Sequence, residues 1–191
     1  MPNCLTIEAA IAQFEHRARP SVIGIDGLPC SGKSTMVARL RQRIDLECVQ
    51  LDEFVLPKRD WPPRNRPAFP FEYIRYETFM KAVETLAKLG SCSFYPFDWD
   101  NLTISDRLRT VTLTKPVIVE GVSSLDSRLY PLYDLRIFVE SDRASTLQTA
   151  IDRGVGAWET EWRELFLPSA DLYMLTEPQK RADLLVAGRG A

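Results

Sequence analysis

One eight-residue stretch near the start of the chain has the residue types and spacing of a loop that binds phosphate. It runs Gly27-Leu-Pro-Cys-Ser-Gly-Lys-Ser34 and matches the pattern G-x-x-x-x-G-K-[ST] at every fixed position. The glycines let backbone N–H groups turn toward a phosphate, the lysine adds a mobile cation, and the final hydroxyl can hold Mg²⁺. The residues expected to contact a nucleotide are Gly27, Cys30, Ser31, Gly32, Lys33, Ser34 and Thr35.

The segments on either side of this phosphate loop favour nucleotide binding over the alternative, an ordinary glycine-containing turn. Residues 22–25 form a short apolar run typical of a buried parallel strand. Apolar residues between Met36 and Ile44 recur with helical spacing. A helix that starts directly after the loop points its positive end at the bound phosphate. The pattern therefore predicts a nucleotide-binding site.

Two carboxylates follow later predicted strands and suggest where the phosphate goes. Asp52 follows the strand that begins at Cys48, and Glu120 ends the run VIVE. If both strands flank the first, these side chains meet beyond the carboxyl edge of the sheet, where such folds bind ligands. One carboxylate would orient or deprotonate a hydroxyl, and the other would hold Mg²⁺. We expect Asp52 to be the base and Glu120 to bind the metal with Ser34, although Asp52 could instead cap a helix.

The order of predicted elements defines the fold class. Strands at 22–25, 48–51, 117–120, 135–139 and 183–187 are separated by helical patterns, among them 76–86, 142–153 and 158–173. This alternation predicts an α/β fold with a five-stranded parallel sheet and helices on both faces. The length of 191 residues and the even composition indicate a single domain over 1–191.

Composition and charge exclude several other classes of protein. The 24 Lys and Arg residues nearly balance 26 Asp and Glu residues, so no overall field favours a nucleic acid or an anionic membrane. No apolar run approaches the roughly 20 residues needed to cross a bilayer. The four cysteines lack the close paired spacing of zinc or redox sites. We expect a cytoplasmic protein with a small-molecule partner and neither a nucleic-acid nor a membrane partner.

Seven segments follow one another from about Val22 to Gly188: GIDGLPCSGKST, LDEF, YPFDW, VIVEG, LRIFVES, P-x-x-x-x-Y and ADLLVAG. Together they resemble the uridine kinase-like branch of the P-loop kinases. That branch includes nicotinamide riboside kinases and lies near phosphoribulokinase and bacterial pantothenate kinase. The resemblance implies a P-loop NTPase fold and Mg²⁺-dependent transfer of phosphate from ATP to a hydroxyl of a ribose-like acceptor. By position, Asp52 is similar to the family's acidic residue beside the attacking hydroxyl, and Glu120 to its glutamate near Mg²⁺.

Residues 57–72 are rich in proline and arginine and are expected to form an insertion on the acceptor side. Arginines there could meet an anionic acceptor, aromatic rings could stack on it, and a carboxylate could bind sugar hydroxyls. The alternative is a solvated loop with incidental charge. The resemblance adds the YPFDW segment, whose rings could instead pack in a β-hairpin. The expected acceptor-binding residues are Arg64, Arg66, Glu72, Phe97, Asp98 and Trp99, with stacking surface from Trp61, Phe69 and Phe71.

The predicted lid, residues 142–160, departs from the family pattern. Uridine kinases carry paired arginines that clamp phosphates, but Thr149 and Ala150 stand at the aligned positions here. Arg153 is the expected replacement as a catalytic cation, with an exposed helix-end cation as the alternative. The family's histidine beside the pyrimidine also has no counterpart. The sequence thus predicts a nucleoside kinase, with a kinase for another acceptor such as pantothenate or a sugar, or an NTP-binding switch, as alternatives.

Overall fold

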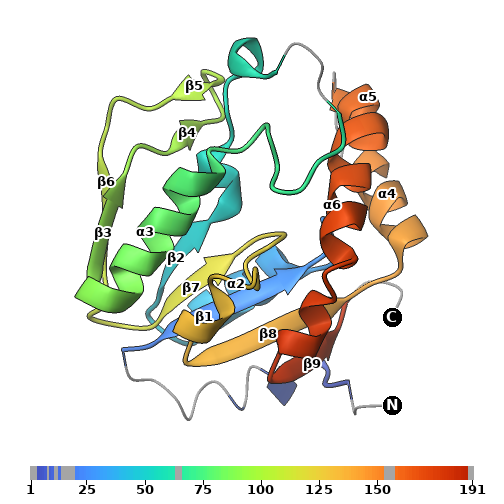
Figure 1. Cartoon of the computed structure of the whole chain (residues 1–191). Helices are drawn as coiled ribbons and strands as arrows, with labels where there is room; N and C mark the ends of the chain where they lie inside the picture. The colour runs from blue at the N-terminus through green and yellow to red at the C-terminus, as the bar shows by residue number, and fades with distance from the viewer. Residues whose placement is uncertain are drawn as a thin grey trace.

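A parallel five-stranded sheet forms the centre of the molecule (Figure 1). The computed structural model describes residues 4–7, 9, 10, 13, 20–62, 66–152 and 158–188. The predicted α/β P-loop fold is confirmed, because all four strand pairs are parallel and the phosphate loop follows the central strand. In spatial order the strands are β2 (Glu47–Gln50), β7 (Val117–Glu120), β1 (Val22–Gly27), β8 (Leu135–Glu140) and β9 (Leu184–Ala187).

The order of the strands differs from the condition under which the two carboxylates were expected to meet. That condition was that both strands flank the first, but β2 pairs with β7, and β7 lies between β2 and β1. The crossover from β1 through α2 (Lys33–Arg41) therefore skips one strand position, which is later filled by β7. The two strand-end carboxylates still meet, because β2 and β7 are direct neighbours with Gln50 opposite Glu120.

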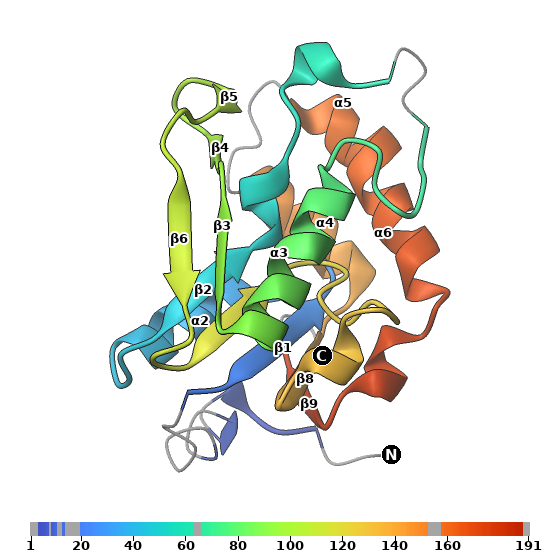
Figure 2. The ribbon, with the colours of Figure 1, turned by 60° about the vertical axis from the view of Figure 1, so that its left-hand side comes forward.

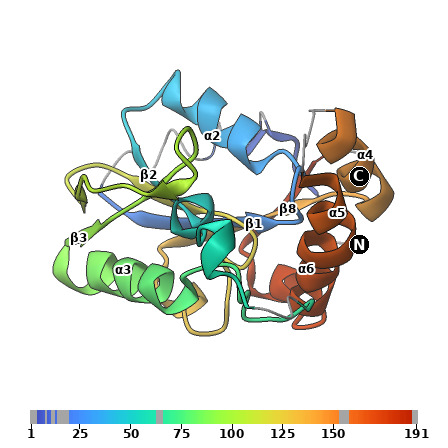
Figure 3. The ribbon, with the colours of Figure 1, turned by 90° about the horizontal axis from the view of Figure 1, so that it is seen from above.

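Helices cover both faces of the sheet (Figure 3). Helix α2 lies on one face, while α3 (Tyr76–Leu89) and α6 (Leu167–Met174) lie on the other. Side chains of β7 alternate between the two layers: Val117 and Val119 join the core with α3, and Ile118 joins the core with α2. A strand buried on both faces has no solvent-facing positions. This explains why the strands appear in the sequence as unbroken apolar runs.

Two small antiparallel pairs extend from one side of the domain (Figure 2). Strand β3 (Ser91–Phe94) pairs with β6 (Arg109–Thr112), and β4 (Phe97–Asp98) pairs with β5 (Thr103–Ile104). Cys92, Phe94 and Val111 turn into the core that includes α3. The pairs therefore anchor the segment between α3 and β7 to the domain.

The C-terminal helices include a change of helical register. After α4 (Arg143–Asp152) come α5 (Glu159–Glu161), a π-helical segment (Trp162–Phe166) and α6. Pro168 lacks the amide hydrogen that a continuous α-helix would donate to the carbonyl of Glu164, and the π segment lies directly before it. Trp162 and Phe166 of this segment line the same pocket as residues of the phosphate loop.

The described residues also include short 3-10 turns. None of the described helices is long and apolar enough to cross a membrane. The predicted cytoplasmic location stays a prediction, as do the single-domain boundaries, the acceptor-side insertion and the lid. The 3-10 turns cover Leu51–Phe54, Lys58–Asp60, Tyr130–Leu132 and Pro178–Arg181.

Candidate active site

The phosphate loop connects β1 to α2, and its backbone needs glycine at two positions. Gly27 has φ +144°, and a Cβ there would lie 2.4 Å from the carbonyl oxygen of Val139. Gly32 has φ +114° and caps the start of α2. Both φ values lie in the region that side chains rarely adopt. Substitution at either position would therefore distort the loop that points N–H groups at a phosphate.

Lys33 begins α2 and is almost fully buried, with 5% of its surface exposed. Its ammonium group folds back over the loop and donates hydrogen bonds to the carbonyl oxygens of Gly27 (3.0 Å) and Leu28 (2.8 Å). An ammonium group with only two neutral acceptors keeps a donor free for a third. Lys33 is thus held at the loop, beside the space into which the phosphates are expected to enter.

Glu120 lies at the end of β7 and is held there by the register of three strands. It is opposite Ile25 of β1 and Gln50 of β2. Its Oε2 atom lies 3.5 Å from Ser34 Oγ and 3.4 Å from Gln50 Nε2, both of which can donate to it. Burial raises the pKa of Glu120, the nearby Asp52 charge raises it further, and Lys33 opposes both effects. The site therefore holds a carboxylate that lacks full compensation for its burial.

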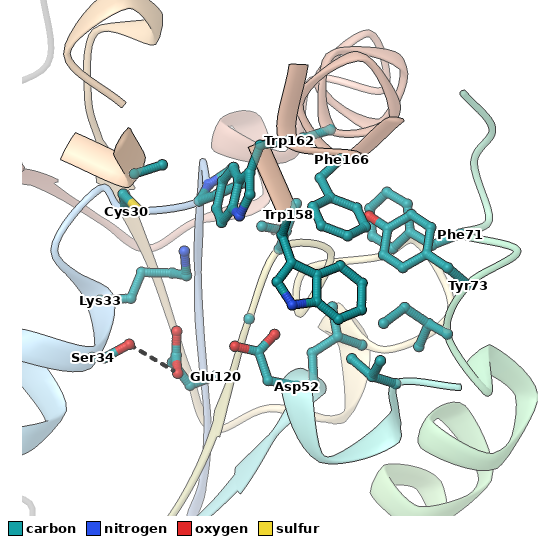
Figure 4. Close-up of a pocket in the computed structure, with 18 of the residues that line it drawn as sticks. Cys30, Lys33, Ser34, Asp52, Phe71, Tyr73, Glu120, Trp158, Trp162 and Phe166 are labelled. Carbon is teal, nitrogen blue, oxygen red and sulfur yellow. Dashed lines mark hydrogen bonds between the residues drawn. The ribbon is translucent and has the colours of Figure 1, made fainter. Parts of the chain in front are cut away.

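Asp52 is presented to the site by the 3-10 turn that follows β2. The capping role falls to Glu53, whose carboxylate accepts the backbone N–H of Gln50 at 2.9 Å. Arg109 forms an ion pair with Glu53, and Arg75 donates to the carbonyl of Glu53 at 2.9 Å. These contacts fix the turn and leave the neighbouring Asp52 side chain directed into the pocket (Figure 4).

The environment of Asp52 combines solvent access with enclosure. Its side chain is exposed to water, yet protein walls surround the pocket that contains it. This enclosure raises the pKa of Asp52, and the charge of Lys33 opposes the rise. Because water reaches the carboxylate, we expect a smaller rise than full burial would give. Asp52 is therefore an accessible carboxylate with enhanced basicity, which suits a general base.

The phosphate loop and both carboxylates line one pocket of about 490 Å³ (Figure 4). This size is in the usual range for small-molecule sites. All four tryptophans of the chain also line it, on segments far apart in the sequence. The described lining residues that could take part in chemistry or stacking are Cys30, Lys33, Ser34, Thr35, Asp52, Trp61, Phe71, Tyr73, Trp99, Glu120, Trp158, Trp162 and Phe166.

Aromatic rings from three segments form one wall of the pocket, and we call this set the aromatic wall: Trp61, Tyr73, Trp158, Trp162 and Phe166. The centroid of Trp61 lies 5.6 Å from that of Trp158 and 5.9 Å from that of Phe166. Tyr73 and Phe166 are 4.8 Å apart, and Trp162 and Phe166 are 5.7 Å apart. Rings at these separations already touch one another. A flat ligand would therefore lie against this wall rather than between its members.

An ion pair holds the two sides of the aromatic wall together. Lys58 forms a salt bridge with Glu161, and its ammonium group lies 5.1 Å from the ring centroid of Trp158. The backbone N–H of Ala68 also donates to Ser169 Oγ at 3.2 Å. The segment after β2 and the helix α5 to α6 are thus joined across the pocket. Their contact explains how distant parts of the chain build a continuous surface.

The structure brings some predicted acceptor-side residues to the pocket and leaves others outside it. Trp99 and the stacking candidates Trp61 and Phe71 line the pocket. Arg66 and Glu72 are exposed and do not line it, and Phe97 is buried in the core. Arg64 and Arg153 lie outside the described residues. In the phosphate loop, Cys30, Gly32, Lys33, Ser34 and Thr35 line the pocket, whereas Gly27 and Ser31 belong to the loop without lining it.

Asp98 has a local structural role in the described residues. Its carboxylate accepts the backbone N–H groups of Asp100 (2.9 Å) and Asn101 (3.0 Å), and the side-chain amide of Asn101 at 2.8 Å. These bonds lower the pKa of Asp98, with the Asn101 side chain as the largest cause. Asp98 therefore stabilises the turn between β4 and β5. It is not among the residues that line the pocket.

Four members of the aromatic wall were not identified from the sequence. Tyr73 follows the proline-rich segment, and Trp158, Trp162 and Phe166 come from the helix region after α4. The last three are spaced four residues apart, so they share one face of a helix. This aromatic stripe was visible in the sequence, but helical spacing alone does not separate a pocket wall from a core-facing side.

Comparison with known proteins gives relatives of low identity and shared fold. No family model matches the chain. A uridine kinase of Limosilactobacillus reuteri (strain DSM 20016) is 24% identical over 190 residues, covering 93% of this chain and 87% of the relative.

Solved structures with the same fold cover nearly the whole chain. A protein described as a possible uridine kinase from Bacillus stearothermophilus has a TM-score of 0.70 at 22% identity, covering 94% of this chain and 98% of that protein. A candidate fructose transport system kinase from Silicibacter sp. TM1040 has a TM-score of 0.65 at 22% identity, covering 98% and 99%. The chain is thus similar in sequence to uridine kinases at low identity and shares its fold with solved P-loop kinase structures, which supports a likeness to the uridine kinase-like branch.

Proposed function

We propose that the protein transfers the γ-phosphoryl group of ATP to a hydroxyl of a nucleoside or a related small metabolite. The observation that carries the proposal is the convergence of Lys33, Asp52 and Glu120 on one pocket (Figure 4). A phosphate loop alone suits many NTP-using proteins, whereas an accessible carboxylate beyond the loop suits activation of a hydroxyl. The likeness to uridine kinases supports the same class of reaction.

On the donor side, the phosphate loop offers N–H groups and Lys33 to the phosphates of ATP. The ammonium group of Lys33 donates to two loop carbonyls. A phosphate oxygen is a charged and stronger acceptor, so we expect Lys33 to turn to it when nucleotide binds. Its charge would then offset the negative charge that develops on the transferred group.

Ser34 and Glu120 fit a Mg²⁺ ion bound together with the nucleotide. Mg²⁺ prefers oxygen ligands and is held by one or two carboxylates plus phosphate oxygens and water. Ser34 Oγ and Glu120 Oε2 are 3.5 Å apart beside the loop. The described residues contain no group of three or more His, Cys, Asp or Glu side chains that could hold a metal, so the phosphates would complete the site. When bound, the ion would neutralise phosphate charge.

On the acceptor side, Asp52 would orient the attacking hydroxyl and accept its proton. Its carboxylate faces the pocket at the end of β2, next to the strand that carries Glu120. A pKa that is raised from the usual value makes a stronger base, while the charge of Lys33 favours the ionised form of the carboxylate. The separate environments of Asp52 and Glu120 suit separate roles, one toward the acceptor and one toward the metal.

The aromatic wall favours an acceptor with a flat ring, which supports a nucleoside. Aromatic faces stack on a planar base, whereas the branched chain of pantothenate has no ring to offer. Pantothenate also carries a carboxylate, and Lys33 is the only basic residue among the described residues that line the pocket. A sugar is the second candidate acceptor, because the candidate fructose transport system kinase shares the fold.

The proposal is tested by measuring ADP formation with a panel of uridine, other nucleosides, pyridine ribosides, pantothenate and fructose. We expect ADP release to depend on a nucleoside or riboside and to be lost in Lys33→Ala, because this variant removes the cation at the transferred phosphate. Hydrolysis at the same rate with or without any acceptor would contradict the kinase proposal. Stimulation by fructose alone would favour the sugar candidate.

Replacing Asp52 with asparagine should separate catalysis from nucleotide binding. The amide keeps the size of the side chain but cannot accept the proton of the hydroxyl. We expect kcat to fall about 10²-fold, while the affinity for ATP changes less than about threefold. Steady-state kinetics and calorimetric titration with an ATP analogue provide the two measurements. Unchanged turnover in Asp52→Asn would exclude its role as base.

Replacing Glu120 with glutamine should lower activity but stabilise the unliganded protein. The raised pKa of buried Glu120 means that the folded state binds more protons than the unfolded state between the unfolded and folded pKa values. The free energy of unfolding therefore falls as pH rises through that range. Glu120→Gln removes this pH dependence, so we expect the variant to have a higher free energy of unfolding than the wild type at pH 7.5.

Urea unfolding of wild type and Glu120→Gln at pH 5.5 and 7.5 checks this expectation. The wild type should lose more stability between the two pH values than the variant does. Stability of the variant should still fall with pH, because Asp26 and Asp52 also have raised pKa values. At the same time, the variant should need more Mg²⁺ for half-maximal activity. Equal pH slopes for both proteins would contradict the assignment of this burial cost to Glu120.

Replacing Trp158 should weaken binding of the acceptor and leave binding of ATP nearly unchanged. Trp158 lines the pocket within the aromatic wall, and stacking on one ring is worth about 1–3 kcal/mol. We expect Trp158→Ala to raise the KM for the nucleoside about tenfold or more, with little change in the KM for ATP. Trp158→Phe, which keeps a ring, should recover most of the loss. An unchanged acceptor KM in Trp158→Ala would remove the aromatic wall from the acceptor site.

A further inference from the structure

Asp26 is a fully buried carboxylate directly before the phosphate loop. It lies near the end of β1, opposite Phe138 of β8, and none of its surface is exposed. Four donors surround it. Its Oδ1 atom accepts the backbone N–H groups of Gly27 (2.6 Å) and Ser123 (3.0 Å), and its Oδ2 atom accepts that of Leu125 (2.7 Å) and the hydroxyl of Tyr173.

These donors come from three separate parts of the site. Gly27 is the first glycine of the phosphate loop. Ser123 and Leu125 belong to the turn that follows Glu120 and Gly121 at the end of β7. Tyr173 belongs to α6, which directly continues the π segment that carries Trp162 and Phe166 of the aromatic wall. One carboxylate thus connects the donor loop, the segment after the expected metal ligand, and the helix that forms the pocket wall.

The chemistry of this junction calls for an ionised carboxylate. All four neighbours present hydrogens, and a carboxylate is a pure acceptor with enough lone pairs for four donors. Asparagine would present its own N–H₂ group to two of them. Burial raises the pKa of Asp26, whereas the hydrogen bonds from Tyr173, Leu125 and Gly27 favour its charged form. Burying this charge costs desolvation free energy, and the hydrogen bonds to Asp26 must offset that cost.

We infer that Asp26 is a positioning residue that fixes the phosphate loop, the turn after Glu120 and helix α6 relative to one another. Its contribution to turnover rests on the proposed function, but its contribution to nucleotide binding does not. Phosphoryl transfer depends on the alignment of donor, metal ligand and acceptor, and small misplacements of such groups lower the rate strongly. Loss of one bond to Asp26 should therefore reduce turnover in a protein that remains folded.

A matched pair of variants tests this inference. Tyr173→Phe removes the hydroxyl that donates to Asp26, while Tyr133→Phe removes a buried hydroxyl that has no hydrogen-bond partner among the described residues. Tyr133 is also buried next to β1, where its ring packs against Gly24. The two substitutions delete the same atom from the same core. Tyr133→Phe therefore reports the loss of a buried hydroxyl without a recorded partner, and only Tyr173→Phe also removes a donor from Asp26.

We expect Tyr173→Phe to lower kcat about tenfold and to weaken binding of Mg-ADP about three- to tenfold, measured well below the melting temperature. Tyr133→Phe should stay within twofold of wild type in both measurements. Asp26→Asn should show the larger losses, and if it fails to fold, the tyrosine pair still decides the question.

The readouts distinguish positioning from simple stability. If Tyr173→Phe lowers only the melting temperature and leaves kcat and Mg-ADP affinity as in Tyr133→Phe, Asp26 is structural and the inference is wrong. If the wild type shows no acceptor-dependent turnover, the proposed function fails, and Mg-ADP affinity alone then tests Asp26. Equal affinity in the two tyrosine variants would overturn the inference in that case too.

Discussion

The parallel register of β2, β7 and β1 is the constraint on which the site depends. It places Gln50, Glu120 and Ile25 side by side, so the segments that follow these strands all emerge at one edge of the sheet. The edge must receive the phosphate loop, Asp52 and the turn after Glu120 in a small space. Donors and carboxylates near the strand ends therefore form hydrogen bonds with one another, as in the four hydrogen bonds to Asp26. Enclosure by protein at this edge raises the pKa values of Glu120 and Asp52. Both carboxylates therefore favour binding of a cation or a proton.

Much of this arrangement could be predicted from the sequence, because its signals are local. The phosphate loop needs glycine and lysine at fixed spacing, and buried parallel strands appear as short apolar runs. The ends of those runs locate Asp52 and Glu120. The strand order could not be obtained in this way, because pairing is a long-range property. The condition that both strands flank β1 is not met, and the carboxylates meet because β2 pairs with β7 instead.

The acceptor side was harder to predict because it is built from distant segments. Trp61 contacts Trp158 and Phe166 only in the folded protein, so the sequence does not show that they share a wall. The spacing of Trp158 and Phe166 alone is that of any amphipathic helix. Arg66 and Glu72 appeared suited to an acceptor by charge alone, but both are exposed away from the pocket. Asp26 was overlooked because one polar residue at the end of an apolar strand gives no sign of the four donors that the fold brings to it. Charge and composition suggest ligands, whereas burial and neighbours decide which residues reach them.

The central claim is that the phosphate passes to a hydroxyl and not to water. Phosphorus NMR of a mixture of the protein, Mg-ATP and a nucleoside follows that group directly. The convergence of Lys33, Asp52 and Glu120 predicts a new phosphomonoester signal that grows in step with ADP, with little inorganic phosphate. Inorganic phosphate as the sole product, at a rate independent of the acceptor, would contradict this assignment of the site.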